Sequence, residues 1–525
     1  MKEIIYIQAG SLANYTAQHF WNTQEAYFTY GDGDNEGEEQ KEPLVDHDIS
    51  FREGVSPKSG DVTYCPRALI FDWKGNFGAL RPDLYDDAGE EEEIRNLWNG
   101  DVVEYRQEQI PKSKYQEELE FAGEDVDRSE DDGRERNAEK RNDSDIRFWS
   151  DYSRVYYHPR SLQKLAEPAD WQDPEGDWNY GQDLFRGYDH ENDLMDDTLR
   201  HFMEECDALQ GIQLINDSSS FGAFVDSMLT LLKDDHPKLT CLTFPFLSSV
   251  VPGEALDNRA MRIAINDALC IRDLKSLSTL SVPLQSSSLW NPGAWSSDLQ
   301  FDNTYRASAI LASHIESATL PLRTKGSVVD LRDLCDSVTY PSNVPFAHLS
   351  GALPVPIPIT DAVFDERMHD FSKVDGADRP STVYARRDVS RGFTGRDRIR
   401  YDAWQEKSGI PITLYDITHA PALPIPTSFP GILRDSSLPP SPTAGTARCL
   451  SSLYSSSATS EIFSVRASFI DDCIKRKRDM AGIVGIEIDE LRELANDLWA
   501  MHDAYHDEGD ISEEGLEEEH DDEEE

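Results

Sequence analysis

Glycine and serine residues that could bind phosphate follow two apolar segments of the sequence. Gly10 comes directly after residues 4–9, and Gly222 follows a run of three serines at 218–220. Glycines let backbone N–H groups close on phosphate oxygens, serine hydroxyls can donate hydrogen bonds, and a helix N-terminus attracts an anion. These residue types are found in nucleotide-binding turns. The interpretation favoured for this chain is a capped strand-to-helix turn that holds no ligand, and residual anion binding is the alternative.

Strand-like and helix-like segments alternate around these turns. Apolar segments predict buried strands at 4–9, 68–72, 211–216 and 239–246. Apolar residues at helical spacing predict helices at 224–233, 305–319 and 488–505. The alternation predicts an α/β fold with a doubly wound, mostly parallel sheet. Ligands bind such sheets beyond the carboxyl ends of the strands, so a site is expected after Ala9, Asp72, Asn216 or Phe246.

The composition argues against several classes of protein. The chain of 525 residues has 100 acidic and 50 basic residues, and its formal charge of −50 repels nucleic acid and anionic lipid. It lacks a run of 18 apolar residues, so we expect no transmembrane segment. Seven scattered cysteines indicate a reducing compartment. The N-terminus resembles neither a secretory signal nor a mitochondrial presequence, so classical matrix import is not expected.

Charge and composition divide the chain into expected domains and insertions. The predicted units are a first α/β domain at 1–290 and a second α/β domain at 291–420. A Pro/Ser-rich loop or linker at 421–460 is followed by C-terminal helices at 461–506 and a disordered acidic tail at 507–525. Two acidic segments, 31–48 and 86–145, are too charged to pack and are expected to be solvated insertions.

Several motifs resemble those of tubulin. The N-terminal MKEIIYIQAG, the segment 206–214 (CDALQGIQL) and the segment 323–332 (RTKGSVVDLR) are similar to tubulin motifs, as are Tyr64 to Asp72 and the pair Trp178-Asn179. With acidic insertions between these blocks, the pattern resembles the Misato family, tubulin-related proteins implicated in mitochondrial distribution and mitochondrial DNA inheritance. The resemblance spans about residues 1 to 350 and implies a tubulin-like fold.

The resemblance also implies which residues would contact a nucleotide. Where tubulins have GGGTGSG, this chain has Asp217, three serines, Phe221 and Gly222, so charge and bulk stand where an anion would approach. On the helix that binds the base in tubulins, Ser308 replaces Asn. The nucleotide contacts that remain are Gly10, Asn14, Asp72, Asn179, Ser218, Ser219, Ser220 and Gly222. We expect no catalytic residue, metal ligand or cofactor; GTP with Mg²⁺ is the alternative.

Two carboxylates match a loop with which one tubulin subunit completes its neighbour's site. Asp330 matches the loop aspartate, and Asp333 stands where the α-type subunit has its water-activating Glu. A solvated helix start is the favoured interpretation of these two residues, and a role in a neighbour's site is the alternative. His502 and His506 have a spacing that can bind metal but lack further ligands, so an exposed helix face is favoured.

We therefore expect a non-enzymatic, tubulin-related protein that supports partitioning of mitochondria and inheritance of mitochondrial DNA. The cellular role follows from the family resemblance. The expected location is the mitochondrion, on its periphery or cytoplasmic face, with a cytoplasmic pool. The expected partners are proteins of the cytoskeleton or the mitochondrial surface, and not nucleic acid. The alternative is a divergent GTPase that forms cytoskeletal-type assemblies.

Overall fold

A parallel sheet forms the N-terminal part of the computed structural model. The model describes residues 2–28, 43–55, 62–80, 110–124, 142–169, 175–255, 257–297, 299–339, 344–356, 359–374, 382–407, 412–433, 445–476 and 485–505. The six strands follow the order β5-β4-β1-β6-β7-β8, and every pair is parallel. They are β1 Ile4–Ala9, β4 Ala68–Trp73, β5 Leu162–Leu165, β6 Gly211–Asp217, β7 Thr240–Phe246 and β8 Leu280–Ser281.

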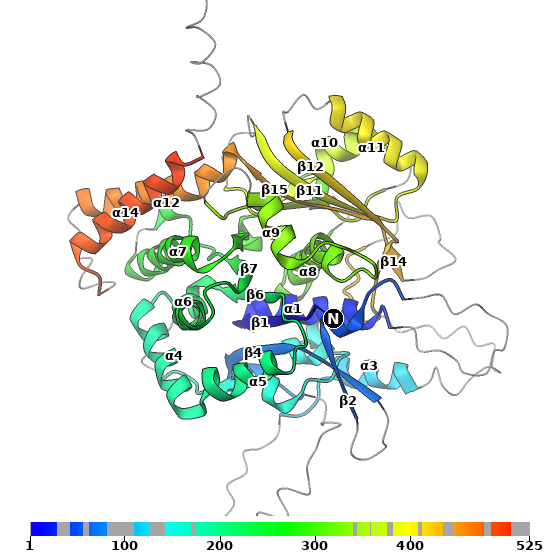
Figure 1. Cartoon of the computed structure of the whole chain (residues 1–525), viewed down its shortest axis with the longest axis horizontal. Coiled ribbons are helices and arrows are strands. Elements are labelled where there is room, and N and C mark those ends of the chain that lie inside the picture. Colours follow the sequence, from blue (N-terminus) through cyan, green and yellow to red (C-terminus); the bar gives the residue numbers. More distant parts are fainter. Residues whose placement is uncertain are drawn as a thin grey trace, which may run out of the picture.

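Helices cover both faces of this sheet (Figure 1). Ile5 and Ile7 of β1 point into the core with one set of helices, and Ile4 and Tyr6 point into the core on the opposite face. The first set is α4 Trp178–Asn192, α6 Ser218–Asp235 and α7 Asn258–Leu277, and the second is α1 Ser11–Glu25 and α8 Thr304–Thr319. Because successive side chains of a strand alternate between faces, a fully apolar strand is suited to this double covering.

A second, mixed sheet packs on the other side of α8. Its order is β10-β9-β15-β11-β12, in which only β11 and β12 are parallel. Its strands are β9 His348–Ala352, β10 His369–Asp370, β11 Val383–Arg391, β12 Ile412–Ala420 and β15 Cys449–Ser456. Helix α8 is buried along nearly its whole length, because α1 covers one side of it and this sheet covers the other.

The remaining elements lie at the edges of the two sheets. Helices α12 Ser460–Lys475 and α14 Ile488–Asp503 lie side by side next to α7 (Figure 1). The other helices are α3 Lys114–Glu124, α5 Arg200–Glu204, α9 Leu331–Thr339, α10 Asp361–Arg367 and α11 Gly395–Lys407. Two further antiparallel strand pairs are β2 Phe51–Val55 with β3 Val62–Pro66 and β13 Leu423–Pro424 with β14 Thr446–Ala447. Among the described helices, none combines the length and the apolar character needed to cross a bilayer.

The predicted α/β class is confirmed, and the apolar segments at 4–9, 68–72, 211–216 and 239–246 are all strands of the parallel sheet. Phe20 and Trp21 of α1 are 2% and 1% exposed and pack against Tyr6 of β1. Two helices, α12 and α14, occupy much of the segment 461–506. The predicted domain boundaries remain predictions, and the acidic tail at 507–525 lies outside the described residues.

Two expectations about insertions are wrong in part. Helix α3 lies within the segment 86–145, and it buries Tyr115 and Leu119 in the core beside α1 and α8. Val45, within the acidic segment 31–48, is 1% exposed and packs against Leu320. In both places a few apolar side chains among many charges suffice to attach the segment to the core. The rest of these two segments lies largely outside the described residues.

The expectation of a Pro/Ser-rich loop at 421–460 is also wrong for its last third. Strand β15 runs from Cys449 to Ser456 and pairs with both β9 and β11 in the middle of the second sheet. Leu450 and Leu453 enter the core, and the serines of the strand are buried. The serine content suggested a linker, but within the fold the hydroxyl of Ser451 bonds to His314 and that of Ser455 bonds to the carbonyl of Val338.

Candidate functional site

The turn between β1 and α1 is closed by a carboxylate from another strand. Gly10 has φ +107°, a conformation that favours glycine, and a Cβ added there would lie 2.5 Å from Oδ2 of Asp217. The backbone N–H groups of Leu12 and Ala13 donate to Oδ2 and Oδ1 of Asp217 over 3.0 and 2.9 Å. These are N–H groups of the first turn of α1, which would otherwise be free to bind a phosphate. The Asp217 carboxylate therefore occupies the anion position of this turn.

Burial makes the charge on this carboxylate costly. It raises the pKa of Asp217 to about 7, although the hydrogen bonds from Leu12 and Ala13 act in the opposite direction. The nearby carboxylates Asp72 and Glu175 also raise this pKa. A phosphate entering the turn would add further negative charge to this group of acids and would compete for N–H groups that are already bonded.

Asn14 and Asp72 bind each other beside this turn. Nδ2 of Asn14 donates to Oδ2 of Asp72 over 2.9 Å and to the carbonyl of Phe71 over 3.0 Å. Oδ1 of Asp72 accepts from the backbone N–H of Trp73 and from Nδ2 of Asn76, at 2.9 and 2.7 Å. Burial raises the pKa of Asp72, and these hydrogen bonds oppose the rise. Two of the predicted nucleotide contacts thus form an internal network that holds β4 to α1.

The predicted phosphate loop is the first turn of α6. Oγ of Ser218 donates to Oδ1 of the buried Asp267 over 2.5 Å, and Ser248 donates to the same carboxylate through its hydroxyl and its backbone N–H. Ser219 and Ser220 are half-buried. A Cβ at Gly222 would lie 3.5 Å from the ring of Trp178 and 3.8 Å from Cβ of Cys270, so this glycine lies at a helix contact.

The prediction that Phe221 adds bulk at the ligand position is wrong. The side chain is 1% exposed and packs in the core, with its ring 5.4 Å from Trp73 and 5.9 Å from Phe224. Because α6 begins immediately at Ser218, the fourth helical residue turns inward and joins the apolar face of the helix.

The structure brings together most of the predicted contacts but not all of them. Gly10, Asn14, Asp72 and the start of α6 meet at the carboxyl edge of the parallel sheet, as expected for this fold. Asn179 is exposed on the first turn of α4, where its Nδ2 lies 3.0 Å from the position of a Cβ at Gly485. Asn179 therefore borders the segment that leads into α14.

Aromatic side chains fill the space between α1 and the start of α8. The ring of His19 stacks on Tyr152 with 4.6 Å between centroids, and its Nε2 lies 2.9 Å from the carbonyl of Tyr305. Ser308, on the helix predicted to bind a base, donates to that same carbonyl over 3.0 Å. Burial lowers the pKa of His19 to about 3, so its ring is neutral at physiological pH. Sequence reasoning missed this cluster because its members are far apart in the chain.

Asp330 and Asp333 form a reciprocal cap at the start of α9. The N–H of Asp333 donates to Oδ1 of Asp330 over 2.9 Å, and the N–H of Asp330 donates to Oδ2 of Asp333 over 3.2 Å. Lys2 lies 3.2 Å from Asp330, and Gln210 accepts from the N–H of Leu331, so this cap lies where β1 and β6 begin. It is thus at the edge of the sheet opposite to Gly10.

The structure offers no further support for metal binding by the terminal helix. Nδ1 of His502 lies 3.0 Å from a carboxylate oxygen of Asp503, and His506 lies outside the described residues. Within the described ranges, no group of three or more His, Cys, Asp or Glu side chains is placed to hold a metal ion.

Comparison with known proteins agrees with the tubulin-like layout. A model described as the Misato Segment II tubulin-like domain matches residues 2–121, and one described as a tubulin domain matches residues 138–324. Protein DML1 of Gibberella zeae is 36% identical over 401 residues, which is 74% of this chain and 74% of the relative. The chain belongs to the Misato family.

Other Misato-family relatives extend this similarity. Protein dml-1 of Neurospora crassa is 29% identical over 569 residues and covers 96% of this chain and 98% of the relative. Protein misato of Drosophila melanogaster is 29% identical over 365 residues, or 64% of this chain and 62% of the relative. The matched region of this Misato-family chain includes β1, β4, β6 and the turns that follow them.

Proposed function

We propose that this Misato-family chain acts as a non-enzymatic, tubulin-related interaction protein that supports partitioning of mitochondria and inheritance of mitochondrial DNA. The observation that carries the non-enzymatic part is the Asp217 carboxylate bound to the N–H groups of Leu12 and Ala13. An internal anion at this turn removes the reason for a nucleotide to bind there. The cellular part of the proposal rests on the resemblance to the Misato family.

Isothermal titration of the whole chain with GTP and with GDP, each with Mg²⁺, tests the non-enzymatic part. We expect no heat of binding up to millimolar nucleotide. Micromolar binding would overturn the proposal. Asp217→Ser removes the carboxylate, and Asp207→Asn is a control that removes an exposed carboxylate at the opposite edge of the sheet. Any gain of nucleotide binding should appear in Asp217→Ser and not in the control.

The proposed location is the cytoplasmic face of mitochondria, with protein partners there or in the cytoskeleton. This can be tested by treating intact mitochondria with protease after cell fractionation. We expect the chain to co-purify with mitochondria and to be digested while matrix proteins stay protected. Protection of the chain together with the matrix proteins would contradict the proposed location.

The cellular role is tested by depleting the chain and measuring mitochondrial DNA copy number and the distribution of mitochondria to daughter cells. Both should be disturbed, and re-expression of the wild-type chain should restore them. Normal copy number and distribution after full depletion would reject the role. The formal charge of −50 repels the phosphates of mitochondrial DNA, so the effect should be carried by protein partners.

A divergent GTPase is the second candidate, and one observation favours it. The turn at Gly10 and the cap formed by Asp330 and Asp333 lie at opposite edges of the same sheet. Head-to-tail assembly would need this arrangement, because one subunit's acidic loop must reach its neighbour's nucleotide. Micromolar GTP binding in the titration above would favour this candidate.

A further inference from the structure

A cavity separate from the Gly10 turn lies between the two sheets and helix α12. Its volume is about 610 Å³, within the size range typical of small-molecule sites. The walls come from the loops after β7 and β8, from the segment 368–374 and from α12. Trp290, Val374 and Val465 supply apolar surface, so the cavity has an apolar wall as well as polar groups.

Arg466 of α12 is a buried cation in the wall of this cavity. The residue is 4% exposed, and its Nη1 donates to the carbonyl of Ile462 on its own helix over 2.7 Å. Its Nε has no hydrogen-bond partner. Among the described residues no carboxylate forms an ion pair with Arg466, and burial lowers its pKa although Asp267 opposes this. Burying a guanidinium that has an unused donor costs free energy, unless an anion pairs with it and accepts that hydrogen bond.

A second unused donor or acceptor lies in the same wall. Nε2 of His369 is buried and has no hydrogen-bond partner, while its ring stacks on Trp295 with 3.9 Å between centroids. The nearby Asp370 also lines the cavity, but its carboxylate is engaged by His348 and Tyr454 at 2.9 and 2.6 Å. Glu254 is exposed. The buried polar groups left without a partner are thus nitrogens, which suits an anionic guest.

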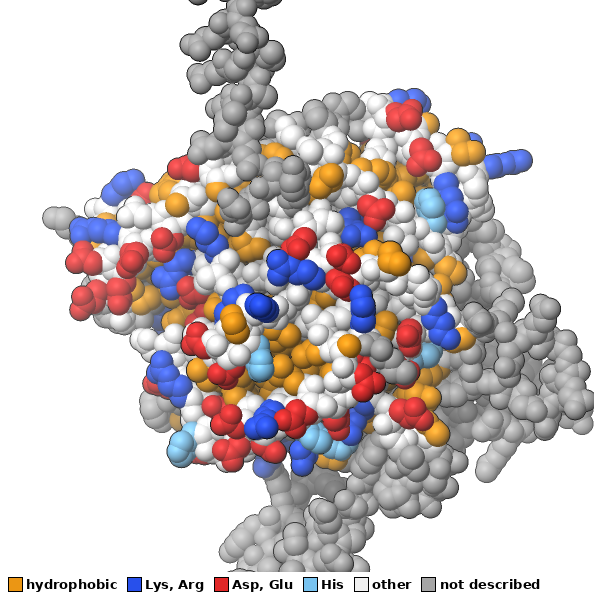
Figure 2. Space-filling model, in the orientation of Figure 1, with side chains coloured by type: hydrophobic (Ala, Val, Ile, Leu, Met, Phe, Trp, Pro, Cys, Tyr) orange, Lys and Arg blue, Asp and Glu red, His pale blue; other side chains and the backbone are white. Residues whose placement is uncertain are grey.

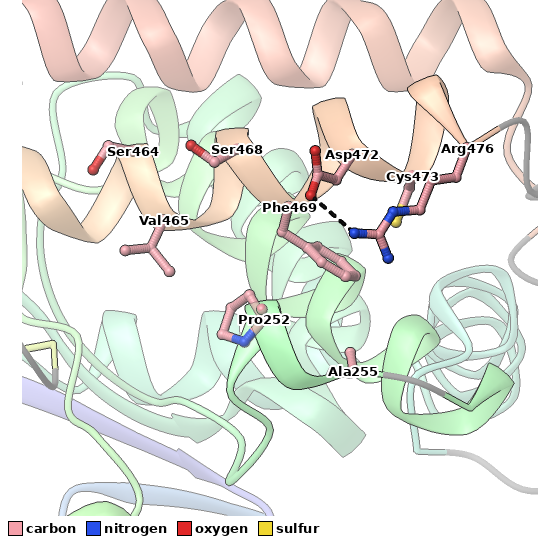
Figure 3. A pocket seen from close by; sticks show the side chains of 10 residues that line it. Pro252, Ala255, Ser464, Val465, Ser468, Phe469, Asp472, Cys473 and Arg476 are labelled. Carbon is pink, nitrogen blue, oxygen red and sulfur yellow. Dashed lines mark ion pairs between the residues drawn. The ribbon is translucent and has the colours of Figure 1, made fainter.

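A neighbouring pocket on the same helix provides an internal comparison (Figure 3). This pocket of about 340 Å³ shares Pro252 and Val465 with the larger cavity. Its arginine, Arg476, is largely exposed and is already paired with Asp472 at 3.5 Å. The two arginines of α12 therefore differ: Arg476 is hydrated and directly paired with Asp472. Arg466 is buried, makes no ion pair among the described residues, and is influenced by the charge of Asp267 without pairing with it.

We propose that the cavity at Arg466 binds a small organic anion, whose carboxylate or phosphate group pairs with the Arg466 guanidinium while its apolar body lies against Trp290 and Val374. An arginine suits either group, because its planar fork donates two parallel hydrogen bonds to an oxyanion. The site is independent of the Gly10 turn, so it does not depend on the function proposed above.

Isothermal titration of the full chain with phenyl phosphate and with benzoate tests this site, and benzyl alcohol serves as a neutral probe of similar shape. We expect one of the two anions to bind with a dissociation constant of about 1 mM or lower, as is usual for ligands of this size. The stronger of the two identifies the head group. No binding of either anion up to about 10 mM, or equal binding of benzyl alcohol, would overturn the proposal.

Two variants and a control connect binding to the cavity. Arg466→Met should weaken binding of the anion by about tenfold or more, because a charge-assisted hydrogen bond is lost. Val374→Trp adds bulk to the cavity wall and leaves the arginine in the sequence, so it should also reduce binding. This variant keeps the test valid if Arg466→Met fails to fold. Arg476→Gln removes a paired arginine from the same helix and should bind like the wild type. Unchanged binding in both cavity variants would place the anion elsewhere and reject the proposal.

Discussion

Asp217 stands at the start of one helix and caps another. It is the residue directly before α6, yet its side chain makes no capping hydrogen bond to that helix. The carboxylate is directed instead to the N–H groups of Leu12 and Ala13 in α1, more than 200 residues away in the chain. The sequence could predict the negative charge at this position. It could not reveal the partner, because that contact depends on the pairing of β1 with β6.

The raised pKa of Asp217 gives a prediction about pH. Its pKa is about 7 in the folded chain against an ordinary value of 3.8, so the folded state binds the proton more tightly than the unfolded state. The contribution of Asp217 to stability is therefore complete below about pH 4 and is lost as the pH rises through about 7. Asp217→Asn removes this titration.

The measurement is the urea unfolding midpoint of the wild type and of Asp217→Asn at several pH values from 4 to 8. The stability of the wild type relative to the variant should fall across this range, by at most about 1.4 kcal/mol per pH unit. Asp207→Asn, at the opposite edge of the sheet, should show no such difference from the wild type. A constant difference between wild type and Asp217→Asn would contradict the assigned pKa.

At the scale of elements, the parallel sheet could be predicted and much of the second sheet could not. Strands β1, β4, β6 and β7 are nearly continuous apolar segments, which is what burial on both faces requires. Strand β15 instead contains buried serines, and the hydroxyls of two of them, Ser451 and Ser455, find partners only in the fold. Ser451 lies 2.9 Å from Nδ1 of His314, and Ser455 donates to the carbonyl of Val338 over 2.6 Å.

The central place of β15 predicts a large effect of a single truncation. Leu453 is 1% exposed and packs in the core with residues of α8 and α9, so Leu453→Ala should cost about 2–5 kcal/mol in unfolding free energy. Leu414 lies on the edge strand β12 of the same sheet and is 41% exposed, so Leu414→Ala should change stability by less than about 0.5 kcal/mol. Chemical denaturation of both variants checks this. Equal effects would mean that β15 is not a central strand.

At the scale of the whole molecule, the tubulin-like layout is retained. At both edges of the parallel sheet, however, the polar groups are hydrogen-bonded within the chain. The carboxyl edge of the sheet holds the Asp217 carboxylate, and the opposite edge holds the reciprocal cap of Asp330 and Asp333. On the face shown in Figure 2, acidic and basic side chains are interspersed, and no broad basic field appears there. The layout, which the family resemblance implied, could be predicted from the sequence. The hydrogen bonding at each edge of the sheet could not be predicted, because it joins residues that are distant in the sequence.

This arrangement predicts that the chain forms no extended polymer. A formal charge of −50, part of which lies in the acidic segments 31–48 and 86–145, makes copies of the chain repel one another at low ionic strength. Light scattering should therefore report a monomer or a small oligomer, with and without GTP and Mg²⁺. A second series at about 1 M salt screens the repulsion, since the Debye length falls to about 3 Å. If polymers form only at high salt, charge repulsion is what prevents assembly. If none form in either series, the cause is the internal hydrogen bonding at the two edges of the sheet. Polymers that form at low salt on addition of GTP would contradict the prediction and support the GTPase candidate.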